Sequence, residues 1–142
     1  MMEGTGRKIL LATLVAGTLD ILSACVYTLA PIKMLKGLAS AVAGKAAVAG
    51  TDWFALLGLA LHFAIMAVMA AFFVIAASRM PVLKRHWLIA GIAYGIGLWA
   101  VMNLIVLPLR FGSHPFTATV LAEQFFSHIV LVGIPIAWFA RR

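Results

Sequence analysis

The sequence predicts an all-α integral membrane protein: a four-helix bundle of two helical hairpins in a single domain, 1–142. Three observations predict this fold. Apolar residues make up 65% of the chain and charged residues 11%, whereas soluble domains have about half and about a quarter. Four apolar stretches are long enough, at about 20 residues, to cross a hydrocarbon core as helices. The alternating pattern of barrel strands is absent, so helices must satisfy the backbone within lipid.

The four predicted transmembrane helices are separated by prolines. They cover residues 9–29, 53–77, 87–107 and 117–140. Pro31 and Pro108 follow the first and third helices, and Pro81 lies in a tight turn after the second. Pro135 lies inside the fourth helix. We expect it to kink this helix or to open its backbone toward a neighbour, because proline lacks the N–H of a regular helix.

The start of the first helix resembles a bacterial lipoprotein signal. Arg7-Lys8 is followed by an apolar stretch that ends at Cys25. Asp20 would lie in the apolar centre of such a signal, so we expect a retained helix instead. Because Cys25 is the single cysteine of the chain, an internal disulfide and a cysteine-based metal site are excluded.

Residues 32–49 predict a short amphipathic helix between the first two transmembrane helices. Lys33, Lys36, Ser40, Gly44 and Lys45 recur at helical spacing, and apolar residues occupy much of the rest. We expect this helix to lie in the membrane interface with its lysines toward the head groups. The alternative is a flexible, alanine-rich loop.

The distribution of basic residues predicts cytoplasmic termini. Seven lysines and arginines fall on the side of the termini and four on the other side, and the basic side is normally cytoplasmic. The seven are Arg7, Lys8, Arg79, Lys84, Arg85, Arg141 and Arg142, and the four are Lys33, Lys36, Lys45 and Arg110. These residues lie in short clusters between apolar runs, so the net charge of +7 marks topology and does not indicate a nucleic-acid partner.

A few polar side chains fall inside the predicted membrane helices. Asp20, His62 and His128 reach a similar depth near the midplane at a rise of about 1.5 Å per residue. Ionisable groups in lipid are costly and indicate a functional site by default, and histidine suits proton exchange. The sequence therefore predicts a polar midplane cluster that moves protons, ions or a small solute. Its members are Asp20, His62, Asn103, Glu123, Gln124 and His128, with Glu123 connecting the cluster to the outside.

Two other readings of these polar residues remain open. The side chains could hydrogen-bond across helices and fix their register without further function. Alternatively, His62 and His128 could be axial ligands of a b-type haem between helices, although we expect no cofactor. His86 and His114 lie near the membrane surfaces, where we expect them to be solvated.

Gly91 and Gly95 form a small-xxx-small face on the third helix, which allows another helix to approach closely. We expect this face to pack within the chain. It also motivates an alternative function, a non-catalytic accessory or scaffold subunit of a larger membrane complex. A bundle this small is expected to work as a homo-oligomer or within such a complex, in contact with the lipid bilayer. No phosphate-binding, zinc-protease or nucleophile-elbow motif occurs, so we expect no enzyme.

Four short sequence motifs are distributed along the chain. They are Gly17-Thr18-Leu19-Asp20, Leu61-His62, the run from Met102-Asn103 to Pro108-Leu109, and His128 ahead of the terminal Arg141-Arg142. Together they resemble a family of small bacterial inner-membrane proteins of unknown function, over nearly the whole chain. The usual Pro-Leu-Ser of that family is Pro108-Leu109-Arg110 here, so we expect a different loop after the third helix. The resemblance implies a bacterial inner-membrane location and four helices, and it implies no substrate, activity or cofactor.

Overall fold

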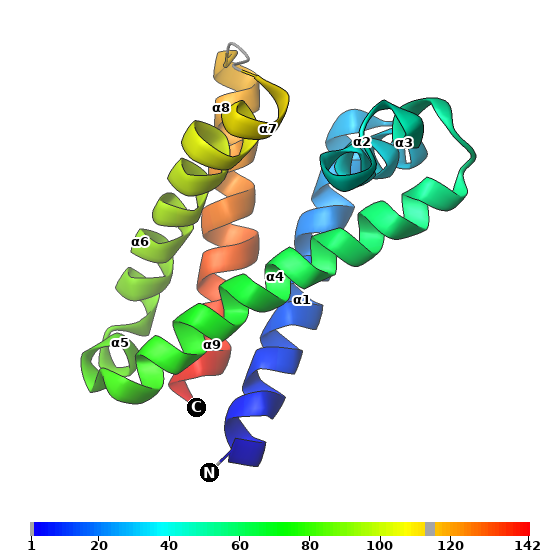
Figure 1. Cartoon of the computed structure of the whole chain (residues 1–142). Helices are drawn as coiled ribbons and strands as arrows, with labels where there is room; N and C mark the ends of the chain where they lie inside the picture. Colours follow the sequence, from blue (N-terminus) through cyan, green and yellow to red (C-terminus); the bar gives the residue numbers. More distant parts are fainter. Residues whose placement is uncertain (1, 113–115) are drawn as a thin grey trace.

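The computed structural model describes residues 2–112 and 116–142, and within these ranges it contains helices and no strands. His114 lies outside the described residues. Four helices are long and apolar enough to cross a membrane: Gly4–Thr28, Trp53–Arg79, Trp87–Phe111 and Ala118–Arg141. They form two hairpins with both termini at the same end (Figure 1). The predicted all-α, four-helix architecture is therefore confirmed, and the chain is a multi-pass membrane protein.

The first hairpin pairs α1 (Met2–Thr28) with α4 (Trp53–Arg79), and two short helices connect them. These are α2 (Pro31–Ala43) and α3 (Lys45–Ala49). Gly44 separates them because it has a φ of +61°, which favours glycine and interrupts a helix. The amphipathic segment predicted as one helix is thus two.

The short helix α2 packs directly on α4. Gly58 of α4 faces the backbone carbonyl of Leu35, and a Cβ atom at position 58 would overlap it. Lys33 and Lys45 are exposed, as an interfacial helix requires. For Lys36 the predicted direction toward head groups is wrong. Its Nζ donates to the Gly50 carbonyl at 2.6 Å and lies 3.5 Å from the carboxylate of Asp52, because the returning loop offers better partners than the interface.

The second hairpin follows α5 (Pro81–Arg85). Its first arm consists of α6 (Trp87–Ala100), a π-helical segment η1 (Val101–Val106) and α7 (Leu107–Phe111). Its second arm consists of α8 (Ala118–Phe126), a π-helical segment η2 (Ser127–Gly133) and α9 (Ile134–Arg141). The third membrane helix thus continues past Pro108 to Phe111, instead of ending at residue 107 as predicted.

Each π-helical segment ends just before a proline. The Leu107 N–H donates to the Met102 carbonyl, and the Ile134 N–H donates to the Ile129 carbonyl, both five residues back. A proline in a regular α-helix clashes with the carbonyl four residues before it. A wider turn relieves this clash, so Pro108 and Pro135 stay inside continuous helices. At Pro135 the structure thus shows a wider, hydrogen-bonded turn within the fourth helix.

Glycines join the two arms of this hairpin. A Cβ on Gly95 would lie 2.5 Å from the His128 carbonyl oxygen and 2.6 Å from the Ile129 Cα. Gly91 faces Gly133 in the same interface, where neither residue has room for a side chain. The small-residue face thus packs within the chain, as predicted.

The two ends of the bundle differ. We call the end with both termini and α5 the terminal side, and the end with α2, α3 and α7 the α2 side (Figure 1). The buried apolar core lies in the half of the bundle nearer the terminal side. Its members are Ala12, Ala16, Met66, Ala70, Phe73, Val74, Ala77, Leu98, Val132, Ile136, Ala137 and Ala140. Toward the α2 side the two hairpins separate, and polar groups and a cavity follow the core.

Candidate functional site

Asp20 is the centre of a polar cluster between three membrane helices. It follows the buried core residue Ala16 by one turn of α1 and keeps 23% of its side chain exposed. The Ser127 hydroxyl, from η2, donates to Oδ1 of Asp20. The Nδ1 of His62, from α4, lies 3.9 Å from Oδ2. Side chains from two neighbouring helices thus converge on one carboxylate.

The other ring nitrogen of His62 fixes the orientation of the imidazole. Nε2 lies 2.9 Å from the Gly17 carbonyl. This contact requires a close approach of the helices, since a Cβ on Gly17 would lie 2.7 Å from the Phe63 ring. A carbonyl only accepts, so Nε2 carries a hydrogen. In the neutral ring Nδ1 is then the acceptor, and it gains its proton beside Asp20 when the ring becomes charged.

Two hydroxyls extend the cluster. The Ser23 Oγ donates to the backbone carbonyl of Asp20 at 3.1 Å and lies 3.3 Å from the Oγ of Ser127. Each hydroxyl has one hydrogen and can also accept. If Asp20 takes up a proton, its carboxyl can donate to Ser127, whose hydrogen then turns toward Ser23. The hydrogen bonds can therefore reverse direction without movement of the helices.

The predicted cluster is only partly assembled. Asp20 and His62 meet, whereas His128 points its Nδ1 to the Gln124 carbonyl of its own helix, 2.9 Å away. Glu123 is half-buried, and its side chain makes no hydrogen bond or ion pair within residues 2–112 and 116–142. Ser127 takes the place expected for His128. The two residues share one depth, but they lie on different sides of the helix.

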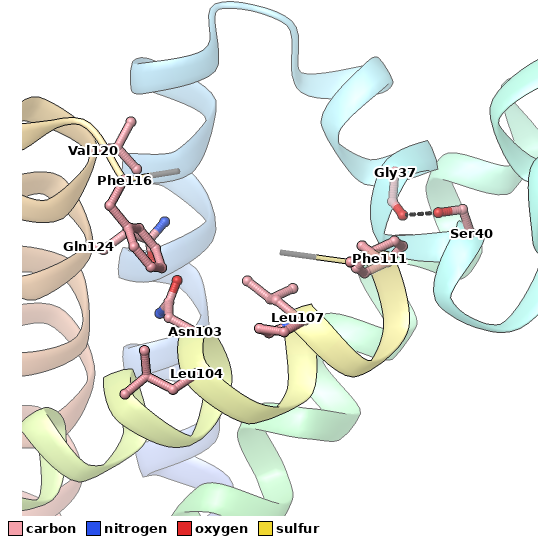
Figure 2. Close-up of a pocket in the computed structure, with 11 residues that line it drawn as sticks. Gly37, Ser40, Asn103, Leu104, Leu107, Phe111, Phe116, Val120 and Gln124 are labelled. Carbon is pink, nitrogen blue, oxygen red and sulfur yellow. Dashed lines mark hydrogen bonds between the residues drawn. The ribbon is translucent and has the colours of Figure 1, made fainter. Parts of the chain in front are cut away.

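A cavity of about 670 Å³ lies on the α2 side of this cluster, between α2 and the second hairpin (Figure 2). Its wall is mainly apolar, formed by residues that include Leu104, Leu107, Phe111, Phe116 and Val120. Asn103 and Gln124 supply polar groups to the wall. Figure 2 shows the amide oxygen of Asn103 directed toward Phe116 and Gln124. Gln124 precedes Ser127 by about one helical turn, so the cavity ends close to the cluster.

Two contacts shape the α2 wall of the cavity. The Oγ of Ser40 donates to the Gly37 carbonyl at 2.6 Å (Figure 2). Arg110 of α7 donates through Nε to the Ala41 carbonyl at 2.5 Å and through Nη2 to the Ser40 carbonyl at 2.9 Å. A cation is well placed at the C-terminal end of a helix. Arg110 thus ties the two hairpins together beside the cavity.

The site offers little for a metal. In the described part of the chain, no group of three or more His, Cys, Asp or Glu side chains could hold an ion. A haem iron at His62 would have to displace either the Gly17 carbonyl or the Asp20 carboxylate from the imidazole. At His128 it would leave Nδ1 on the Gln124 carbonyl and use the opposite nitrogen.

Comparison with protein-family profiles, curated proteins and solved structures finds no match for this chain. The resemblance to the bacterial inner-membrane family therefore stays a prediction. The geometry of the Asp20 cluster and its cavity carries the functional argument.

Proposed function

We propose that this membrane protein moves protons across the bilayer, alone or coupled to a small solute that enters the cavity. Asp20 is the group that binds and releases the proton. The observation that carries the proposal is the convergence of Ser127 and His62 on the Asp20 carboxylate within the membrane helices.

The energetic argument rests on the cost of the carboxylate. An aspartate near the bilayer centre costs about 2.5 to 3.5 kcal/mol on insertion scales. The hydrogen bond from Ser127 offsets part of this cost, and a charged His62 ring, 3.9 Å from the carboxylate, adds an ion pair. An amide in the same place could bond to Ser127 at lower cost. The property that only the carboxylate adds is its exchange of a proton, which supports a relay over a purely structural role.

The route from the membrane surface to Asp20 supports the same proposal. The cavity leads from the α2 side toward the cluster, with Asn103 and Gln124 as polar wall groups. On the terminal side the apolar core separates Asp20 from the membrane surface. Thr13 lies there, two turns before Asp20 on α1, and its buried Oγ1 has no hydrogen-bond partner among the described residues. We propose Thr13 as the next polar group on the route, reached when the core loosens.

The test is proton flux into liposomes. Vesicles containing potassium and a pH-sensitive dye are diluted into low-potassium buffer, and valinomycin then sets an inside-negative potential. Wild-type protein is expected to acidify the lumen faster than empty vesicles. Asp20→Asn should reduce the rate to that of empty vesicles. If wild type does not exceed empty vesicles across a range of pH, the proposal fails.

A matched pair of serine variants tests the cluster itself. Ser127→Ala removes the hydroxyl that contacts Asp20. Ser78→Ala removes a hydroxyl that bonds to Ile75 of its own helix. Hydrogen bonds between membrane helices are worth about 0.6 kcal/mol on average and up to about 1.7, so Ser127→Ala should slow flux about three- to twentyfold. Ser78→Ala should match wild type. Equal effects of the two variants would remove Ser127 from the route.

We further propose that the membrane is the bacterial inner membrane, with both termini in the cytoplasm. The seven-to-four excess of basic residues on the terminal side supports this orientation.

The accessory-subunit alternative loses one of its two motivating features. Gly91 and Gly95 are covered by the second arm of their own hairpin. The helix α2 packs on α4 through Gly58, while Ile32 and Val42 of the same helix stay exposed.

A further inference from the structure

A second hollow lies on the terminal side, away from the Asp20 cluster. It is a groove of about 450 Å³ between α1, the start of α6 and α9. Its inner wall is apolar, with Val15, Ile134, Pro135 and Phe139, and its rim carries Trp87, Trp138 and Arg141. An apolar groove with an aromatic and cationic rim at the end of the membrane helices combines the features of a lipid chain site and a head-group site.

Arg141 is held over the rim by the two indole rings. Its guanidinium carbon lies 4.5 Å from the centroid of Trp87 and 4.3 Å from that of Trp138. Arg142 lies 3.9 Å from the Trp138 ring, and Lys8 Nζ donates to the Arg142 carbonyl at 2.7 Å, which fastens the chain end to α1. Stacking of this kind orders the guanidinium but leaves its N–H groups available at the edge.

Within the part of the chain that the structure describes, no acidic side chain pairs with the basic residues at the rim. Among residues 2–112 and 116–142, the ion pairs are Lys36 with Asp52 and His62 with Asp20, so neither Arg141 nor Arg142 has a carboxylate partner there. A planar guanidinium with free donors matches the oxygens of a phosphate. Tryptophan rings prefer the head-group level of a bilayer, which places this charge where lipid phosphates lie.

We propose that this groove binds one anionic phospholipid. Its phosphate contacts Arg141 and Arg142, and an acyl chain lies over Val15, Pro135 and Phe139. The apolar wall favours a lipid over a soluble phosphate, because only a lipid brings a chain to cover it. Anionic lipid is favoured over zwitterionic lipid because each basic residue near the surface attracts it. This site is independent of the proposed proton route.

The experiment uses the native tryptophans as reporters. The full chain, with Trp53→Phe and Trp99→Phe to remove the two indoles outside the groove, is placed in phosphatidylcholine vesicles with increasing fractions of brominated phosphatidylglycerol. Bromine on an acyl chain in the groove quenches Trp87 and Trp138. The titration is repeated with brominated phosphatidylcholine in phosphatidylglycerol. One basic residue near the surface corresponds to about a fivefold preference, so we expect the anionic lipid to bind at least about fivefold more tightly.

Variants show which residue is responsible for the preference for anionic lipid. Arg141→Gln should lower it at least about fivefold, whereas Arg141→Lys, which keeps the charge, should retain most of it. Arg7→Gln is the matched control, since Arg7 is an exposed arginine of the same side that does not line the groove. The proposal is overturned if wild type binds both lipids equally or if Arg7→Gln has the same effect as Arg141→Gln. Loss of the preference in millimolar inorganic phosphate would overturn the assignment to lipid and indicate a soluble anion.

Discussion

Gly95 connects helix packing with the proposed proton relay, because it lies against the backbone of η2. Gly95→Ala introduces a Cβ that would lie 2.5 Å from the His128 carbonyl oxygen, inside the 3.4 Å of an ordinary contact, so the helices must separate by about 0.9 Å. Both nearest atoms belong to the backbone of His128 and Ile129. The strain therefore cannot be relieved by a rotamer change and must move η2, which carries Ser127.

The size of the effect follows from two opposing terms. Overpacking of this kind costs about 1 to 3 kcal/mol, and replacing glycine by alanine inside a helix returns about 0.5 to 1 kcal/mol. Gly95→Ala should thus lower the free energy of unfolding by up to about 2.5 kcal/mol. Gly97→Ala is the matched control, because a Cβ on Gly97 meets nothing within 4 Å. It should be neutral or stabilise by up to about 1 kcal/mol.

The assay is reversible unfolding in mixed micelles, with helicity followed by far-ultraviolet circular dichroism as the denaturing detergent fraction rises. The same two variants are then tested for proton flux in liposomes. Gly95→Ala should also slow flux, because displacement of η2 lengthens the hydrogen bond from Ser127 to Asp20. Equal stability of the two variants would refute the close packing of α6 on η2. Normal flux in a clearly destabilised Gly95→Ala would refute the link to the relay.

Three further predictions concern the α2 side and the topology. Gly58→Ala places a Cβ against the Leu35 backbone carbonyl. This overlap should weaken the packing of α2 on α4 by about 1 to 3 kcal/mol. Proteolysis of the connection between α1 and α4 should then be faster than in wild type. Arg110→Gln removes the guanidinium donor groups that bond to the Ser40 and Ala41 carbonyls. It should cost about 1 kcal/mol and speed hydrogen exchange at the end of α2, and unchanged exchange would count against this tie. Fusion of green fluorescent protein to either terminus should fluoresce in bacteria, while alkaline phosphatase at the same places should be inactive; the reverse result would invert the proposed topology.

The four membrane helices could be predicted from the sequence because length and hydropathy leave a chain of this composition few alternatives in lipid. The ends of these helices could be predicted less accurately. The third helix continues beyond Pro108 because η1 widens the turn before the proline. The segment after α1 is two helices, since the backbone at Gly44 takes a positive φ. Both differences depend on local backbone geometry, which a hydropathy pattern does not contain.

For the candidate site, the sequence predicts the depth of a residue in the membrane but not the side of the helix on which it lies. The rise per residue places Asp20, His62 and His128 at one depth, and in the structure Asp20 and His62 approach to 3.9 Å. It does not give helix rotation, and neighbouring residues such as Ser127 and His128 differ by about 100° around the axis. The π-helical turn before Pro135 changes that rotation further. Pro135, about two helical turns after these residues, is the signal in the sequence that a regular helix would misplace them.

Infrared difference spectroscopy can detect whether Asp20 takes up and releases a proton inside the membrane, as we propose. Protein reconstituted in vesicles is recorded across a pH titration, and the carboxylic acid carbonyl band is compared between wild type and Asp20→Asn. We expect a band that grows as the pH falls, shifts in frequency when Ser127 is replaced by alanine, and is missing in Asp20→Asn. If the band persists unchanged in Asp20→Asn, with no other pH-dependent carboxyl signal lost, Asp20 is not the proton-binding group.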